Sequence, residues 1–539
     1  MAPKKTKAAV KKPAATRITT RKPAAVSASK PATKPAAKPA VKPAVKTATK
    51  KRASDAIEDN RRAKRPRTDE AEEKPRKTAA NTIKPKAVKA PKSKNIINQV
   101  PSTRQNVYVF GDGTSGELGF GATKKATDIK RPRLNNNLDA KSVGVIALAV
   151  GGMHTVALTE DQKILTWGVN DNGALGRDTT WTGGLRDVSN DNKSDASDSE
   201  DEDPGLELNP NESLPTAVLS SAFPVGTVFV QIAAGDSCSF AVTDEGLVYG
   251  WGTFRNDQGI FGFTLDDDRK IVKQQNTPML IKSLKNIVQI ECGENHALAL
   301  DNKGIVYAWG SGQQDQLGRR LVQRHAEVNL LPTPIALPKR GKIVSIAAGP
   351  NHSFAVTNDG EVWSWGLNSF AQTGIPYPET VDNDIVTGPT KVTSLKGHII
   401  TMMAAGGQHS LALTRDGTTL SFGRMDNFAL GLDSSKLPLD DDTVVRKDEN
   451  GKPRVLFQPT ALKDVPTARF ISCGTDHNIV ITKSGKAYSW GFNESYQCGQ
   501  GGEESNIKVP TLIGNGALKD QELVWAGCGG QFSVLSSNA

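Results

Sequence analysis

The chain has 539 residues, 37% of them hydrophobic, and a formal net charge of +11. No apolar run approaches the roughly 18 residues that a membrane-spanning helix needs, and no signal peptide precedes the basic N-terminus, so we expect no membrane contact. The five cysteines show neither a CxxC pair nor metal-ligand spacing, so we expect no metal site, no disulfide framework and no cofactor.

Residues 1–100 differ in composition from the rest of the chain. They contain no glycine and no aromatic residue, but they hold 11 of the 30 prolines and 29 of the 68 Lys and Arg, against seven acidic residues. The net charge is therefore +22 for this segment and −11 for the remainder. With so few groups to bury, residues 1–100 are predicted to be a disordered basic tail that binds DNA phosphates without reading sequence.

Two basic clusters in this tail resemble a bipartite nuclear import signal. The clusters are Lys51 and Arg52, followed by Arg61, Arg62, Lys64, Arg65 and Arg67. They predict a nuclear import receptor as a partner and a nuclear, chromatin-associated protein. A solvated basic linker is the alternative interpretation.

Six successive units each carry a glycine that is followed 17 residues later by an aromatic-glycine pair. The two glycines of each unit are Gly151 and Gly168, Gly235 and Gly252, Gly293 and Gly310, Gly349 and Gly366, Gly406 and Gly423, and Gly474 and Gly491. Each unit reads as strand, glycine break, strand, tight turn and strand. Asn358-Asp359-Gly360 shows the turn, because the turns that join hairpin strands need the positive φ that glycine tolerates.

A seventh unit is divided between the two ends of residues 101–539. Phe110-Gly111 begins the series without leading strands, and Val524–Leu535 supplies a matching strand pair at the other end. We therefore predict an all-β domain, a seven-bladed β-propeller closed by N- and C-terminal segments that share one blade. A linear β-solenoid is the alternative, although it would not need the divided unit.

Five of the seven histidines occupy one position, three residues after the repeat glycine. They are His154, His296, His352, His409 and His477. A metal ring or a set of acid-base groups is one interpretation, and a hydrogen bond to the adjacent blade is the other. We favour the hydrogen bond, because Cys238 and Phe532 take the same place in two units, which a metal site would not tolerate. No phosphate loop, GxSxG elbow or HExxH motif occurs, so we predict an activity without covalent chemistry, not an enzyme in that sense.

Three segments depart from the repeat and are candidate contact sites. Asp187–Asp203 is acidic and serine-rich; the alternatives are a neutral surface loop, a surface that repels DNA, a phosphate acceptor at Ser194, Ser197 or Ser199, and a transient partner of the basic tail. Phe254–Gly262 is predicted to be a hairpin with a polar tip, either a contact device or a harmless insertion. Gly318–His325 holds three arginines in six residues, which suits phosphates or acidic protein surfaces.

Several motifs are similar to those of the regulator of chromosome condensation family. They are Gly151–Val156 (GGMHTV), Asn170–Thr179 (NDNGALGRDT), Ala234–Ser237 (AGDS), Trp251–Arg255 (WGTFR) and Gly406–His409 (GGQH). The resemblance covers about residues 104–537, all seven units. It implies a propeller that acts as a monomer at chromatin and loosens GDP from the small GTPase Ran, so that GTP replaces it.

The resemblance also implies which residues meet the partners. The Ran-binding set is Asp236, Phe254, Arg255, Asn256, Asp257, Gln258, Gly259, Ile260, Asn295 and His409, with Asn295 standing where the family pattern has an acidic residue. Arg319, Arg320 and Arg324 are implied to contact the nucleosome on the opposite face. A propeller scaffold and a structural chromatin protein, both without exchange activity, stay open as alternative functions.

Overall fold

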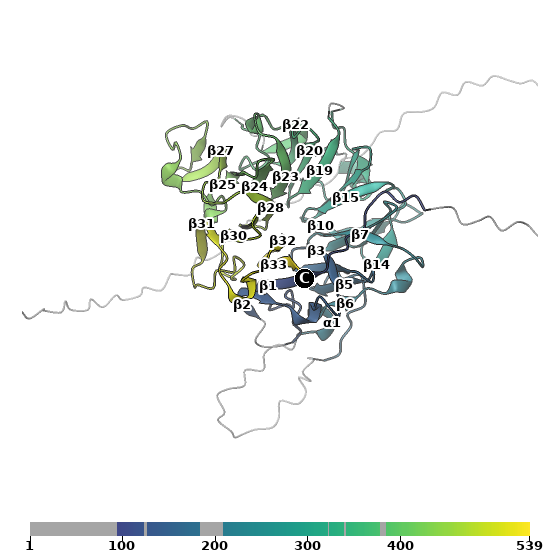
Figure 1. Ribbon diagram of the computed structural model, residues 1–539. Helices are drawn as coiled ribbons and strands as arrows, with labels where there is room; N and C mark the ends of the chain where they lie inside the picture. The colour runs from purple at the N-terminus through teal and green to yellow at the C-terminus, as the bar shows by residue number, and fades with distance from the viewer. Residues whose placement is uncertain (1–93, 123–126, 184–207, 322, 339–340, 378–383) are drawn as a thin grey trace, which may run out of the picture. The chain divides into compact units, whose positions relative to one another are not determined.

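The computed structural model describes residues 94–122, 127–183, 208–321, 323–338, 341–377 and 384–539 (Figure 1). The basic clusters between Lys51 and Arg67 and the acidic segment Asp187–Asp203 lie outside these residues. Seven antiparallel sheets, six of four strands and one of five, confirm the predicted all-β fold with seven blades. No helix in the described part is long and apolar enough to cross a membrane.

The blades follow one another in chain order, and the strands of each blade are named from the innermost outward. Blade one contains β32 (Leu523–Cys528), β33 (Phe532–Asn538), β1 (Gln105–Asp112) and β2 (Asp128–Leu134). Blade two contains β3 (Val145–Val150), β4 (His154–Thr159), β5 (Ile164–Gly168) and β6 (Thr216–Ala217), and blade three contains β7 (Phe229–Ala234), β8 (Cys238–Thr243), β9 (Val248–Gly252) and β14 (Gln275–Leu280). Blade four contains β15 (Ile287–Cys292), β16 (His296–Asp301), β17 (Val306–Gly310) and β18 (Thr333–Pro334).

Blade five contains β19 (Ile343–Ala348), β20 (His352–Thr357), β21 (Val362–Leu367) and β22 (Ile385–Lys391); blade six β23 (Ile400–Ala405), β24 (His409–Thr414), β25 (Thr419–Arg424), β27 (Pro453–Ala461) and β26 (Val445–Lys447); blade seven β28 (Ala468–Cys473), β29 (His477–Thr482), β30 (Ala487–Phe492) and β31 (Asn506–Leu512). Short helical segments in the connections are α1 (Pro210–Ser213), η2 (Asn136–Leu138), η4 (Ser220–Ala222), η5 (Gln323–Leu330), η6 (Thr393–Leu395), η7 (Asp426–Phe428), η8 (Ser434–Lys436) and η9 (Gly516–Leu518).

The two ends of the propeller close the ring as predicted. β1 pairs with β33 in antiparallel register from Gln105 opposite Asn538 to Gly111 opposite Phe532. The C-terminal segment therefore contributes two strands to blade one, and the N-terminal segment contributes the other two (Figure 1). Closure leaves no blade without a neighbour on either side.

The tight turns between second and third strands behave as their sequences predict. Gly360 adopts a φ of +84° in blade five. Gln162 replaces this glycine in blade two and still adopts a φ of +63°. Its side chain has a contact that glycine lacks, because Oε1 accepts a hydrogen bond of 2.7 Å from the backbone N–H of Phe229 in blade three.

The repeat histidines tie neighbouring blades together, which confirms the hydrogen-bond interpretation. In each case Nε2 lies 2.7–2.9 Å from a side-chain oxygen at the start of the next blade's second strand, an arrangement we call the histidine link. The five links join His154 to Ser239, His296 to Ser353, His352 to Ser410, His409 to Asn478 and His477 to Ser533. Burial lowers the pKa of His296, His352 and His477 to about 3, so these rings are neutral.

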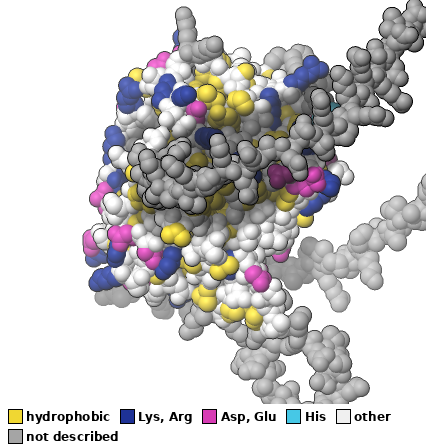
Figure 2. Space-filling view, turned by 90° about the vertical axis from the view of Figure 1, so that its right-hand side faces the viewer, with side chains coloured by type: hydrophobic (Ala, Val, Ile, Leu, Met, Phe, Trp, Pro, Cys, Tyr) yellow, Lys and Arg dark blue, Asp and Glu magenta, His cyan; other side chains and the backbone are white. Residues whose placement is uncertain are grey.

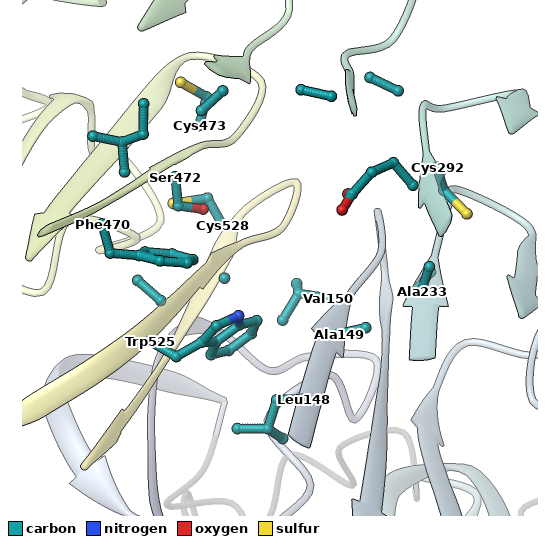
Figure 3. Close-up of a pocket in the computed structure, with 18 of the residues that line it drawn as sticks. Leu148, Ala149, Val150, Ala233, Cys292, Phe470, Ser472, Cys473, Trp525 and Cys528 are labelled. Atoms are coloured by element: carbon teal, nitrogen blue, oxygen red, sulfur yellow. The ribbon is translucent and has the colours of Figure 1, made fainter. Parts of the chain in front are cut away.

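The seven innermost strands surround a central channel with a volume of about 360 Å³. Its wall is mostly small and apolar, with Phe470, Trp525 and the thiols of Cys292, Cys473 and Cys528 among its side chains (Figure 3). Burial raises the pKa of Glu291, which also lines the channel, to about 7. Three of the five cysteines thus lie between the channel and the blade cores against which they also pack, and none of the five forms a disulfide.

The direction of the strands gives the ring two distinct faces. The turns between first and second strands and the loops after third strands share one face, which we call the hairpin face. Neighbouring turns on it are bonded directly, since Asp236 N–H donates to Glu294 O at 3.0 Å and Gly152 N–H donates to Gly235 O at 3.2 Å. The turns between second and third strands, among them Thr159–Lys163 and Thr243–Leu247, lie on the opposite face.

The N-terminal segment meets the propeller before the boundary expected at residue 100. Asn98 and Ile97 each donate a backbone hydrogen bond to Asp244 O, at 3.0 and 2.9 Å, and Lys94 Nζ donates to Gly226 O at 2.6 Å. Residues 94–100 therefore belong with the propeller. The expected boundary is too late because composition does not reveal that an asparagine docks on a turn.

Candidate protein-binding site

The predicted hairpin is present on the hairpin face, directly after β9. It consists of β10 (Phe254–Asn256) and β11 (Gly259–Gly262), with Asn256 opposite Gly259 at the tip. Gly259 adopts a φ of +97° and has no neighbouring atom within 4 Å of where a Cβ would lie. The glycine is therefore required by the conformation of the turn and not by crowding.

The base of the hairpin is anchored in an aromatic cluster. Phe254 is fully buried, and its ring centroid lies 6.0 Å from Phe263 and 6.4 Å from Phe240. Phe240 packs edge-on against Trp309 of blade four at 5.5 Å. Phe254 thus fixes the hairpin between two blades, and its side chain is not available for direct contact with a partner.

The flank of the hairpin is held by polar side chains of blade four. Arg255 N–H donates to Asn295 Oδ1 at 2.8 Å, and Asp257 N–H donates to Gln313 Oε1 at 3.0 Å. The Gln313 amide also donates to the Asp257 carboxylate, which lowers the pKa of Asp257. The Arg255 guanidinium lies 3.6 Å from Asp236 of the β7–β8 turn. The hairpin therefore has a fixed orientation.

The structure brings together site residues that the sequence holds far apart. Asp236, the hairpin and Asn295 come from three segments and form one continuous patch on the hairpin face. Glu294 joins them, because Asn295 Nδ2 donates to its carboxylate at 3.1 Å. Burial and the nearby Asp236 raise the pKa of Glu294, while Arg255 lowers it. The sequence motifs did not indicate Glu294 and Gln313, although Glu294 directly follows a repeat glycine.

The tip of the hairpin is open to a partner. Arg255, Asp257, Gln258 and Ile260 are exposed, and Ile260 keeps 41% of its accessible surface. Charged side chains of both signs are interspersed on the side of the molecule shown in Figure 2, with small hydrophobic groups between them. An exposed apolar residue beside charged groups on a rigid support is typical of a protein contact.

His409, expected on the partner-facing surface, is buried instead. Its Nε2 lies 2.7 Å from Asn478 Oδ1 of blade seven, and burial lowers its pKa. The adjacent Gln408 lies in the β23–β24 turn, where its Oε1 accepts a hydrogen bond of 2.8 Å from Arg424. The ring of His409 is therefore placed to orient this turn and not to touch a partner itself.

Arg319 is part of the fold. Its Nη1 donates to Ala308 O at 3.0 Å, and burial lowers its pKa to about 10. Arg177 occupies the equivalent position in blade two, where Nη2 donates to Thr166 O at 2.8 Å and burial again lowers the pKa to about 10. The first arginine of the loop, Arg319, is thus a structural residue of the repeat that bonds to the third strand of its own blade. Comparison with Gly176-Arg177 could have shown this from the sequence.

Arg320 and Arg324 are exposed. The loop leaves β17 at the hairpin face, because all third strands run in the same direction, and then returns to β18, where Thr333 pairs with Ala308. The two arginines lie in this connection between β17 and β18, and their contact with a nucleosome stays a prediction.

Comparison with known proteins agrees with this architecture. Residues 106–535 match the RCC1-like domain family. The guanine nucleotide exchange factor SRM1 of Saccharomyces cerevisiae is 41% identical over 435 residues, which cover 80% of this chain and 86% of SRM1. The protein pim1 of Schizosaccharomyces pombe is 39% identical over 86% of this chain and 80% of its own length.

A solved structure extends the similarity to three dimensions. The crystal structure of Prp20p from Saccharomyces cerevisiae, studied together with its binding to Gsp1p and histones, superposes with a TM-score of 0.72 at 38% identity, over 82% of this chain and 95% of that one. Yeast RCC1 (Prp20) has also been solved with Kap60 bound. On the family match and these relatives, this chain belongs to the regulator of chromosome condensation (RCC1) family.

Proposed function

We propose that this chain is a guanine nucleotide exchange factor that promotes GDP release from the small GTPase Ran. The hairpin carries this proposal. In the described residues, the loop after the third strand of blade three begins with the two-stranded sheet of β10 and β11, where the repeat has a glycine-rich turn. It is anchored in blade four and exposes a polar tip. Relatives named as exchange factors at about 40% identity support the same function.

The exchange proceeds without covalent chemistry. A partner shifts the equilibrium between nucleotide-bound and nucleotide-free GTPase only through a difference in affinity for the two states. The propeller therefore binds nucleotide-free Ran more tightly than Ran with GDP. A rigid hairpin suits this task, because a flexible loop would adapt to both states and weaken the difference.

Some residues of the predicted Ran-binding set contact Ran directly, and others only hold the contacting residues in position. Asp236, Arg255 and Asn295 form the patch at the base, while Asp257, Gln258 and Ile260 at the tip touch Ran. Asn256 and Gly259 shape the turn, with Asn256 Oδ1 accepting from Gln258 N–H at 3.0 Å. Phe254 and His409 are buried and act by holding the hairpin and the β23–β24 turn.

The protein acts at chromatin in the nucleus. Its basic tail contacts DNA, and the segment that follows the tail docks at Asp244 on the face opposite the hairpin. This docked segment leaves the hairpin face free, so that the GTPase can bind there. Arg320 and Arg324 are the loop residues available to a nucleosome, and the histone binding studied for Prp20p supports such a contact.

Nuclear delivery depends on the basic clusters of the tail. Lys51, Arg52, Arg61, Arg62, Lys64, Arg65 and Arg67 form the import signal. The structure of Kap60 bound to yeast RCC1 (Prp20) supports an import receptor as the partner of this chain.

Size-exclusion chromatography with the full chain tests the difference in affinity. The chain is expected to elute with nucleotide-free Ran as a stable one-to-one complex and to release Ran when GDP or GTP is added. Equal co-elution with Ran in all three states would contradict an exchange factor and favour a scaffold.

A further inference from the structure

Two of the seven blade interfaces lack the histidine link. Between blades three and four, Cys238 stands in place of the histidine and Ala297 in place of its hydrogen-bonding partner. Between blades one and two, Phe532 and Thr155 take these places, and Thr155 Oγ1 is buried without a hydrogen bond. These two interfaces need another means of fixing one blade against the next.

The segment Ile97–Gln105, which we call the N-terminal strap, bridges the first of these interfaces. Asn98 Nδ2 donates to Thr243 O of blade three at 3.0 Å and to Ile287 O of blade four at 2.8 Å. The side chain thus joins two blades through two backbone carbonyls, as a histidine link joins two blades elsewhere. Asp244 O accepts from the backbone of the same segment and fixes its position.

The other end of the strap bridges the second interface. Arg104 Nη1 donates to Ala140 O at 3.3 Å, and its guanidinium forms an ion pair with Glu160 in the turn of blade two. Gln105 in β1 of blade one donates from Nε2 to Ile146 O of blade two at 3.2 Å. The strap therefore contacts both interfaces from which the histidine link is missing.

The strands that Asn98 joins lead straight to the hairpin. β8 runs from Thr243, beside Asn98, to the β7–β8 turn, where Ser237 O accepts from Thr253 N–H at 2.8 Å just before the hairpin. β15 runs from Ile287, beside Asn98, to the turn whose Asn295 accepts from Arg255. Any change in the register of these two strands on the opposite face moves the two anchors of the hairpin against each other.

We propose that Asn98 is a positioning residue for nucleotide exchange. It holds blades three and four together at the interface that lacks the histidine link. Asn295 and Gln313 of blade four are thereby kept in position to hold the hairpin that follows β9 of blade three. The proposal rests on the proposed exchange function. Asn98 itself touches neither Ran nor nucleotide, because it lies on the opposite face.

The test compares Asn98→Ala with a matched control in the full chain. We expect kcat for GDP release from Ran to fall about fivefold with KM nearly unchanged, because a misplaced hairpin impairs release more than docking. Asn358→Ala is the control, since Asn358 also lies on the opposite face and its side chain also bonds to the backbone, with Oδ1 accepting from Lys342 N–H at 3.1 Å beside an interface with an intact link. The control is expected to match the wild type.

Hydrogen exchange measures positioning without relying on activity. Loss of Asn98 should speed exchange of the Arg255 and Asp257 amides, which donate to blade four, while amides of blade six stay protected. If these amides are unchanged in Asn98→Ala, the positioning role is wrong even when the wild type accelerates GDP release. If the wild type does not accelerate release, the proposed function fails, and the amide result still decides whether Asn98 positions the hairpin.

A rescue separates this role from a general loss of stability. Introducing Cys238→His and Ala297→Ser into Asn98→Ala rebuilds the repeat's own histidine link at the same interface. We expect kcat and hairpin protection to return most of the way to wild type. Failure of a folded triple variant to recover either quantity would overturn the proposal that Asn98 replaces the link.

Discussion

At the repeat glycines, the histidine of the same blade occupies the space that a side chain would need. A Cβ on Gly406 would lie 2.2 Å from His409 Cε1, and one on Gly151 would lie 2.2 Å from Gly235 O of the next blade. Glycine, histidine and the neighbouring blade therefore form one packing unit. The fixed spacing in the sequence follows from this close approach.

Gly406→Ala is expected to destabilise the propeller by about 3 kcal/mol, because the new Cβ would displace the buried His409 ring from its hydrogen bond to Asn478. Thermal denaturation followed by circular dichroism measures the effect. Gly514→Ala is the control, since no atom lies within 4 Å of the position its Cβ would take. Equal melting temperatures for the two variants would contradict the packing argument.

Glu117 is a buried carboxyl at a position where three other blades have glutamine, namely Gln316, Gln372 and Gln497. Its Oε2 accepts from Ser115 N–H at 2.9 Å, as Gln372 Oε1 accepts from Phe370 N–H at 2.9 Å in blade five. Burial raises the pKa of Glu117 from 4.5 to about 7. The folded state therefore holds this proton to higher pH than the unfolded state does.

The free energy of unfolding therefore decreases as the pH rises from about 4.5 through 7. Glu117→Gln removes this decrease, because glutamine carries no proton that the folded state must release. The variant is expected to be more stable than the wild type by roughly 3 kcal/mol at pH 8 and about equally stable at pH 4. Urea denaturation at both pH values measures the difference. A benefit of the same size at pH 4 would show that charge is not the cause.

Among the elements, the hairpin of β10 and β11 is the one that we hold responsible for exchange. Replacing Arg255–Gly259 by a short glycine-serine turn is expected to slow GDP release at least about tenfold, because the tip contacts are lost. The fold should persist, since Phe254 and its aromatic cluster remain. Circular dichroism and release of labelled GDP are the two measurements.

The neighbouring hairpin supplies a matched control. β12 (Thr264–Leu265) and β13 (Ile271–Val272) belong to the same insertion, and the turn residues Asp267–Arg269 are exposed. A glycine-serine replacement of these three residues should leave release at the wild-type rate. An unfolded Arg255–Gly259 variant would show instead that the first hairpin is structural.

Elements with a repeating pattern could be predicted from the sequence, and those held by single side chains could not. The strand pair Val524–Leu535 and the hairpin Phe254–Gly262 follow from spacing and turn chemistry. The strap leaves no periodic signal, because Asn98 acts through two carbonyls. Burial of His409 and Phe254 was also missed, since a shared motif places a residue in a segment without fixing the direction of its side chain.

On the scale of the whole molecule, two segments of opposite net charge have two different tasks, DNA binding by the tail and nucleotide exchange by the propeller. The tail carries an excess of basic residues and the propeller region an excess of acidic ones. Deleting residues 1–93 is expected to abolish salt-sensitive DNA binding, because counterion release by the tail drives it, and to spare exchange, because Asn98 remains. Fluorescence anisotropy at two salt concentrations measures binding. Undiminished binding by the deletion would move the DNA site onto the propeller.

Release of fluorescent GDP from Ran in the presence of the full-length chain is the decisive measurement for the exchange function. We predict release well above the intrinsic rate at catalytic amounts of chain, with an excess of unlabelled nucleotide present and with many Ran molecules discharged per propeller. Release at the intrinsic rate, whatever the amount of folded chain added, would contradict the exchange function.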